Sequence, residues 1–156
     1  MNKQESIAFV WHKIVDEVAV VIKDEPMLAN FLQTTVLDHS NMGESLGFHL
    51  ASKLSNQAIP FATLLPLFNE IFTSEQVLYA ASRDIQATVD RDSACSVYST
   101  PFLYFKGFLA LQAYRVTHQL WHRGNQSLAL MLQHSISTHF AVDIHPAAKI
   151  GSGILI

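Results

Sequence analysis

The C-terminal stretch Asp143–Ile156, DIHPAAKIGSGILI, lacks the apolar spacing of a helix. Large aliphatic residues recur in it every six positions, at Ile144, Ile150 and Ile156. This is the period of a parallel β-helix, in which each six-residue rung places one side chain inward and then turns a corner. The residues between them are rich in alanine, glycine and serine, which suit such corners because glycine adopts backbone angles that other residues resist. We therefore expect the first rungs of a β-helix here.

The chain before this stretch is predicted to be helical. Apolar residues recur at helical spacing, and proline, serine and asparagine separate the segments. We expect helices at 6–22, 26–37 and 41–54, a short one from 60, and further helices at 74–90, 99–123 and 125–140. The fold class is thus an all-α, multi-helix domain at residues 1–140, followed by an incomplete β-helix at 141–156.

Local signals set several of these helix ends. Ser74 is a good N-cap, and Glu75 then lies in a first turn where the helix dipole favours an acid. Pro101 suits a first helical position, and Gly124 suits a C-terminal stop. Pro66 is expected to be tolerated only in the first turn of its helix, because proline has no backbone N–H to donate.

Composition limits the function classes. Hydrophobic residues make up 49% of the chain and charged residues 15%, which suggests apolar surface buried between subunits of a homo-oligomer. The net charge of −3, without a basic cluster, argues against a nucleic-acid partner. The most apolar stretch, 102–121, contains too many polar residues for a membrane span. Cys95 is the only cysteine, so no internal disulfide forms, which fits a cytoplasmic protein.

Five residues are candidates for chemistry. His118 and His122 are four residues apart, a spacing that can grip a metal, but no third ligand is evident, so we predict ordinary histidines and no metal site. Cys95 has no base beside it in the sequence and is expected to be inert. Asp92 and Asp143 each read most simply as an acid in a turn.

Several motifs, in this order and spacing, resemble bacterial serine O-acetyltransferase, a member of the hexapeptide-repeat acetyltransferases. They are Glu25–Ala29, Ala51–Leu54, Asp84–Ala87, Asp90–Asp92, Tyr98–Pro101, Lys106–Phe108, Leu111–Arg115 and Val142–Gly151. The resemblance covers nearly the whole chain. It implies an α-helical N-terminal domain, then a left-handed β-helix, and hexamers built as dimers of trimers. The family transfers acetyl from acetyl-CoA to L-serine in cysteine biosynthesis and is inhibited by L-cysteine.

The resemblance also assigns roles to two acids. Asp143 matches the aspartate that orients the general-base histidine, and Asp92 matches an acid that contacts the ammonium group of serine or cysteine. The family motif continues past Ile156 with an Asp-His pair that includes the base. The acetyl-CoA groove and the tail that binds O-acetylserine sulfhydrylase also lie beyond it, so no cofactor-binding residue is expected in this chain.

We interpret the chain as the N-terminal portion of a serine O-acetyltransferase, truncated before the catalytic histidine. On its own it is expected to be inactive in acetyl transfer and to act in assembly, with residues 142–156 frayed or rearranged against a neighbour. The alternatives are a non-enzymatic helical oligomerisation module and a hexapeptide acyltransferase with another acceptor.

Overall fold

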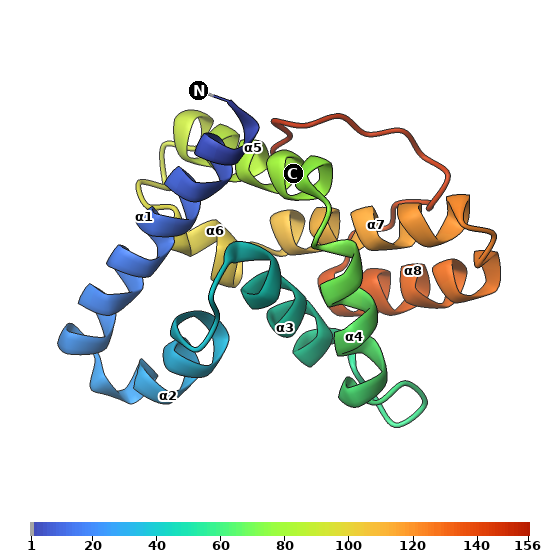
Figure 1. Ribbon diagram of the computed structural model, residues 1–156, viewed down its shortest axis with the longest axis horizontal. Helices are drawn as coiled ribbons and strands as arrows, with labels where there is room; N and C mark the ends of the chain where they lie inside the picture. The colour runs from blue at the N-terminus through green and yellow to red at the C-terminus, as the bar shows by residue number, and fades with distance from the viewer. Residues whose placement is uncertain (1) are drawn as a thin grey trace.

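The computed structural model describes residues 2–156, and Figure 1 shows its helices. They are α1 (Lys3–Asp24), α2 (Ala29–Leu32), α3 (Met42–Leu54), α4 (Phe61–Ile71), α5 (Glu75–Arg91), α6 (Ser99–Tyr104), α7 (Lys106–His122) and α8 (Gln126–Phe140). A 3₁₀ turn (η1, Pro26–Leu28) precedes α2, and a π-helical turn (η2, Gln33–Leu37) follows it. The all-α prediction is confirmed for the helical domain. None of the helices in residues 2–156 is long and apolar enough to cross a membrane.

Side-chain caps fix where helices begin. The Asn2 side chain accepts from the Glu5 N–H at 2.9 Å, and the Glu5 carboxylate accepts from the Asn2 N–H at 2.8 Å. This capping box extends α1 upstream of the predicted start. The Asn41 and Ser74 side chains cap α3 and α5 by accepting from the backbone N–H groups of Glu44 and Val77, as predicted for Ser74. Gly124 has φ +88°, the left-handed conformation expected of a helix stop.

Pro66 lies inside α4 rather than in its first turn, so the sequence-based expectation was wrong. The bond that proline cannot make would run to the carbonyl of Ala62. Both Pro66 and Ala62 are exposed, so water can reach that carbonyl. The loss of one hydrogen bond on the solvent side is tolerable because the opposite face, with Leu64 and Phe68, is fully buried.

The single helix predicted at 99–123 is two helices, α6 and α7, separated at Phe105, whose backbone is extended (φ −78°, ψ 113°). In a continuous helix the Leu103 carbonyl would accept from the Gly107 N–H. Here Nε2–H of His49, on α3, donates to that carbonyl at 3.0 Å. A buried histidine from another helix thus satisfies the end of α6 and allows the chain to turn.

The core forms where pairs of helices pack together: α7 on α8, α3 on α4 and α1 on α5. Close approach of α3 to α4 depends on Gly43 and Gly47, because a Cβ at Gly43 would lie 2.5 Å from the Phe72 carbonyl oxygen. A Cβ at Gly47 would collide with Oδ1 of Asn69. The largest fully buried side chains include Ile14, Leu32, Leu46, Leu50, Phe68, Ile85, Phe102 and Tyr114.

Residues 141–156, called the strap below, run back over the helices in an extended path (Figure 1). No residue from 2 to 156 is in a β-strand, so the predicted rungs of a β-helix are not seen. A rung needs a neighbouring rung to bond its backbone. The strap bonds to side chains of α5 and α7 instead, and it makes a tight turn in which the Ala148 N–H donates to the His145 carbonyl at 2.9 Å. The strap is therefore docked on its own helical domain.

Candidate functional site

Asp143 lies at the start of the strap, just after α8. The C-cap of α8, Ala141, is in the left-handed conformation (φ 59°), and this turns the chain away from the helix axis. The Asp143 side chain is exposed, and its Oδ1 accepts from Nε2 of Gln133 on α8 at 2.8 Å. The carboxylate is thus held by one amide, and it remains open to solvent on the outer side.

Asp92 is the C-cap of α5. Its backbone N–H donates to the Thr88 carbonyl at 2.9 Å, and its Oδ1 accepts from the Ala94 N–H at 2.9 Å. The half-buried side chain therefore organises the loop that leads to α6. Asp92 and Asp143 lie on different elements and share no hydrogen-bond partner in residues 2–156. Within residues 2–156 no hydrogen bond links the two predicted acids, directly or through a common partner.

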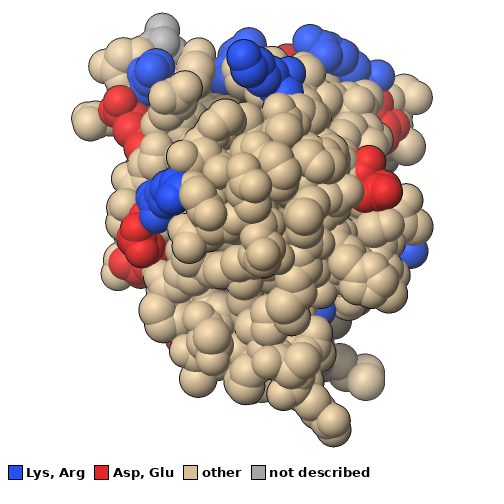
Figure 2. Space-filling view, turned by 90° about the vertical axis from the view of Figure 1, so that its right-hand side faces the viewer, with Lys and Arg blue, Asp and Glu red and all other residues tan. Residues whose placement is uncertain are grey.

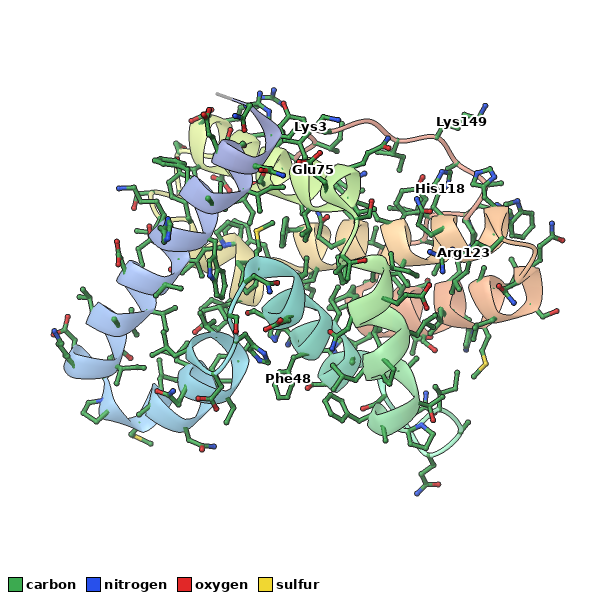
Figure 3. All side chains as sticks on the ribbon, viewed as in Figure 1. Lys3, Phe48, Glu75, His118, Arg123 and Lys149 are labelled. Atoms are coloured by element: carbon green, nitrogen blue, oxygen red, sulfur yellow. The ribbon has the colours of Figure 1, made fainter. Side chains whose placement is uncertain are left out.

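The strap follows α7 from its C-terminal end toward its N-terminal end. His118 Nδ1–H donates to the Pro146 carbonyl at 2.7 Å, and the Tyr114 hydroxyl donates to the Ala148 carbonyl. Burial raises the pKa of the Tyr114 phenol, which keeps it a hydroxyl donor. In Figure 3, Lys149 lies on the strap as it passes above the end of α7 that carries His118. Two side chains of α7 thus donate hydrogen bonds to strap carbonyls that have no strand partner within residues 2–156.

Further along, the strap meets a buried polar network formed by Asp84 of α5 with Gln112 and Arg115 of α7, called the Asp84 network below. The Asp84 and Gln112 side chains are fully buried, and Arg115 is 8% exposed. The Arg115 guanidinium donates to Asp84 Oδ2 at 2.5 Å, and Gln112 Nε2 donates to the same oxygen at 3.0 Å. No role was predicted for this network from the sequence, although its members lie in two of the motifs, Asp84–Ala87 and Leu111–Arg115.

A cavity of about 370 Å³ lies between α5, α7 and the strap. Its walls come from Lys3, Gln76, Val77, Tyr79, Ala80, Tyr114, Arg115, His118, Gln119, Ile150, Gly151 and Ser152. Lys3 enters from the start of α1, and Figure 3 shows it at the opposite end of the strap's path from Lys149. None of the described residues that line the cavity is acidic. Because the strap forms one wall, the cavity exists only while the strap is docked.

The other residues considered for chemistry are the histidine pair on α7 and the single cysteine. The His118 and His122 rings lie 4.4 Å apart, but no group of three His, Cys, Asp or Glu side chains able to hold a metal occurs in residues 2–156. Cys95 is buried, and burial raises the pKa of its thiol, which disfavours the nucleophilic thiolate. Its Sγ lies 3.4 Å from the Val97 carbonyl oxygen.

Comparison with known proteins gives a consistent result. Residues 10–113 match the family described as serine acetyltransferase, N-terminal. The serine acetyltransferase of Haemophilus influenzae is 48% identical over 147 residues, which are 94% of this chain and 55% of that protein. This chain therefore spans about half the length of that relative.

Solved structures agree in fold. A soybean serine acetyltransferase complexed with serine is 44% identical, with a TM-score of 0.93 over 96% of this chain and 62% of that one. Two serine acetyltransferase structures, one in complex with CoA and one in complex with cysteine, are each 46% identical with TM-scores of 0.91. Each covers 94% of this chain, which in turn covers 63% and 61% of theirs. On this evidence the chain belongs to the serine acetyltransferase family, of which it contains the N-terminal helical domain.

Proposed function

We propose that this chain is the helical part of a serine O-acetyltransferase, which transfers acetyl from acetyl-CoA to L-serine. In this proposal residues 1–140 form the oligomerisation and substrate-site domain, and residues 141–156 lead into a left-handed β-helix. The observation that carries it is the length of the structural match, which reaches 96% of the chain and so includes helices and strap together. The relatives' complexes with serine, CoA and cysteine support the choice of substrate, co-substrate and inhibitor.

Asp143 is proposed to orient the histidine that acts as general base on the serine hydroxyl. A carboxylate that accepts the imidazole N–H fixes the ring and stabilises its cation, as in catalytic triads. Gln133 holds Oδ1 of Asp143, while Oδ2 accepts no hydrogen bond within residues 2–156. One oxygen is thus fixed by the helical domain and the other can face an imidazole supplied by the β-helix.

Asp92 is proposed to pair with the ammonium group of serine, or of cysteine as inhibitor. A charge-assisted bond between ammonium and carboxylate is among the stronger polar contacts in proteins. The Ala94 N–H already anchors Oδ1 of Asp92, so the side chain is oriented before a ligand arrives. Because Asp92 and Asp143 lie on different elements and share no partner within residues 2–156, the proposal places the complete site between neighbouring subunits.

The same proposal includes a homo-oligomer, a dimer of trimers, and docking of O-acetylserine sulfhydrylase through a C-terminal tail of the intact enzyme. Figure 2 supports assembly, because Lys and Arg gather along one rim while most of that face carries no charged side chain. On α8, Leu130 and Met131 are 44% and 38% exposed. Apolar side chains on an uncharged face favour contact between subunits.

The test compares two proteins. Purified 1–156 should transfer no acetyl group from acetyl-CoA to L-serine, because it lacks the histidine base. The same residues joined to the C-terminal part of the Haemophilus influenzae relative should form O-acetylserine. In that fusion, Asp143→Asn should lower kcat by about 100-fold, the scale of general acid–base catalysis. Asp92→Asn should raise KM for serine by about 30-fold, the equivalent of about 2 kcal/mol for one charged hydrogen bond.

Two results would contradict this proposal. Acetyl transfer by 1–156 alone would show that the chain needs no β-helix histidine. A well-folded fusion that acetylates another acceptor in preference to serine would assign a different member of the hexapeptide acyltransferases. Calorimetry with L-cysteine on 1–156 and on the fusion gives an independent reading, since only the fusion should bind.

A further inference from the structure

We propose that Asp84, Gln112 and Arg115 are positioning residues that fix Gly151–Ile154 of the strap to α5 and α7, and thereby align the chain following Ile156 with Asp92. This inference rests on the proposed function for the role of Asp92. The docking of the strap is independent of the proposed function, because it is argued from the contacts of the Asp84 network alone.

The Asp84 network holds two backbone groups of the strap. Oδ1 of Asp84 accepts from the Ile154 N–H at 2.9 Å. The Arg115 Nη2 group that binds Asp84 Oδ2 at 2.5 Å also donates to the Gly151 carbonyl at 2.9 Å. Gln112 holds the pair in place, since its Nε2 donates to Asp84 and its Oε1 accepts from Arg115 Nε at 3.2 Å. One donor and one acceptor, three residues apart, therefore fix the register of the strap.

The burial of the Asp84 network indicates that its role is not simply to stabilise the fold. Removing a carboxylate and a guanidinium from water costs free energy that their attraction repays only in part, and apolar replacements of such pairs are often neutral or stabilising. Apolar side chains at these positions would fill the space between α5 and α7. They could not bind the Ile154 N–H or the Gly151 carbonyl. The property that only the polar network supplies is a fixed strap.

The strap is tied to the helix that carries Asp92. Asp84 and Asp92 are eight residues apart on α5 and its C-cap, a rise of about 12 Å along a rigid helix. Arg91, the last residue of α5, donates from Nη1 to the Gly153 carbonyl at 3.0 Å. Two residues of α5, Asp84 and Arg91, thus bind the same Gly153–Ile154 peptide unit of the strap, and Arg91 directly precedes Asp92 in the chain. The direction in which the chain leaves Ile156 is set relative to Asp92 by these contacts.

The test replaces the network with apolar residues in the 156-residue chain. The variant is Asp84→Leu with Gln112→Leu and Arg115→Met, which leaves none of the three groups buried without a partner. Thermal unfolding reports the helical domain, and amide hydrogen exchange read by mass spectrometry reports peptides from 142–156. We expect the unfolding midpoint to change little while exchange in the strap rises by about tenfold or more, as expected for local opening.

The chain offers a matched control in its exposed ion pair. Arg123 binds Glu70 at 2.7 Å with both side chains in solvent. Replacing that pair by Met and Leu removes the same chemical groups and should leave strap exchange unchanged. A second variant, Ile154→Pro, removes the N–H that Asp84 accepts and leaves the three network side chains in place, so it probes the strap even if the triple variant fails to fold. Strap exchange should rise in it as well, while α5 and α7 keep their protection.

Unchanged strap exchange in a folded triple variant, or in Ile154→Pro, would overturn the inference. Faster exchange throughout the helices of Ile154→Pro would overturn it too, because the bond would then support the fold generally. None of these readouts requires acetyl transfer. A strap that loosens as expected while the fusion fails to acetylate serine would therefore refute the proposed function and leave strap positioning intact.

Discussion

The burial of His49 leads to a prediction of how the stability of this domain depends on pH. Its side chain is 2% exposed, its Nε2–H donates to the Leu103 carbonyl, and its ring stacks on Phe102 at 6.3 Å. Burial, and secondarily the nearby Lys53 charge, lower its pKa from 6.5 to about 4, although the bond to Leu103 acts in the opposite direction. The folded protein therefore holds His49 neutral over a range in which the unfolded chain would protonate it.

The sign and size follow from linkage. As the pH falls below 6.5, His49 is protonated in the unfolded state but stays neutral in the folded state. The free energy of unfolding therefore decreases until the pH reaches about 4. A difference of about 2.5 between the two pKa values corresponds to about 3 kcal/mol in total, at about 1.4 kcal/mol per pKa unit. Between pH 7.5 and pH 5 the loss is about 2 kcal/mol.

The assay is urea unfolding at both pH values for the native chain and for His49→Gln. Glutamine can place an N–H near the Leu103 carbonyl but does not titrate, so it keeps the end of α6 capped. Other titrating groups, such as His139, whose pKa burial also lowers, are common to both proteins and cancel in the comparison. The native chain should lose about 2 kcal/mol more than the variant on acidification. Parallel losses in the two proteins would refute the reasoning.

Three further substitutions test local features of the fold. Gly43→Ala should lower the free energy of unfolding by about 1–3 kcal/mol, because its Cβ would lie 2.5 Å from the Phe72 backbone carbonyl oxygen; denaturant unfolding measures this. Glu17→Ala should cost about 2 kcal/mol in the same measurement, because the Glu17 carboxylate accepts two backbone N–H bonds at the start of α6, at 3.1 and 2.7 Å. Gly107→Ala should speed amide exchange in 150–156, because its Cβ would displace the backbone of Ile156. Gly151→Ala is its control, as nothing lies within 4 Å of that Cβ.

Local rules predicted the helices best where neighbouring residues decide their ends. Ser74 and Asn41 cap helices through bonds to backbone groups three residues later, and such contacts are readable from sequence. The break between α6 and α7 was not predictable in this way. His49, which binds the carbonyl at the end of α6, is 54 residues away from it, and Gly107 alone does not distinguish a break from a continuous helix.

The rungs predicted for the strap are not seen for a related reason. Its six-residue period describes a β-helix, but rungs need neighbours, and residues 2–156 contain none that pairs with it. Its path is set by side chains of α5 and α7 that the period does not reveal. The candidate acids were found through resemblance rather than through their own pattern, since Asp92 and Asp143 alone look like ordinary turn residues. Their proposed roles remain predictions for the fusion protein to test.

The motif Asp84–Ala87 was recognised by resemblance, but its structural role is seen only in the packing of α5. Successive residues of α5 face different neighbours: Asp84 faces the strap, Ile85 enters the core, and Gln86 donates to Ser6 of α1 at 3.0 Å. A helix held on three sides cannot rotate or slide without breaking buried polar bonds. Asp92 at its end is therefore fixed relative to α1, α7 and the strap at once. If Asp92 binds the substrate's ammonium group, the buried polar residues of α5 determine where that group sits.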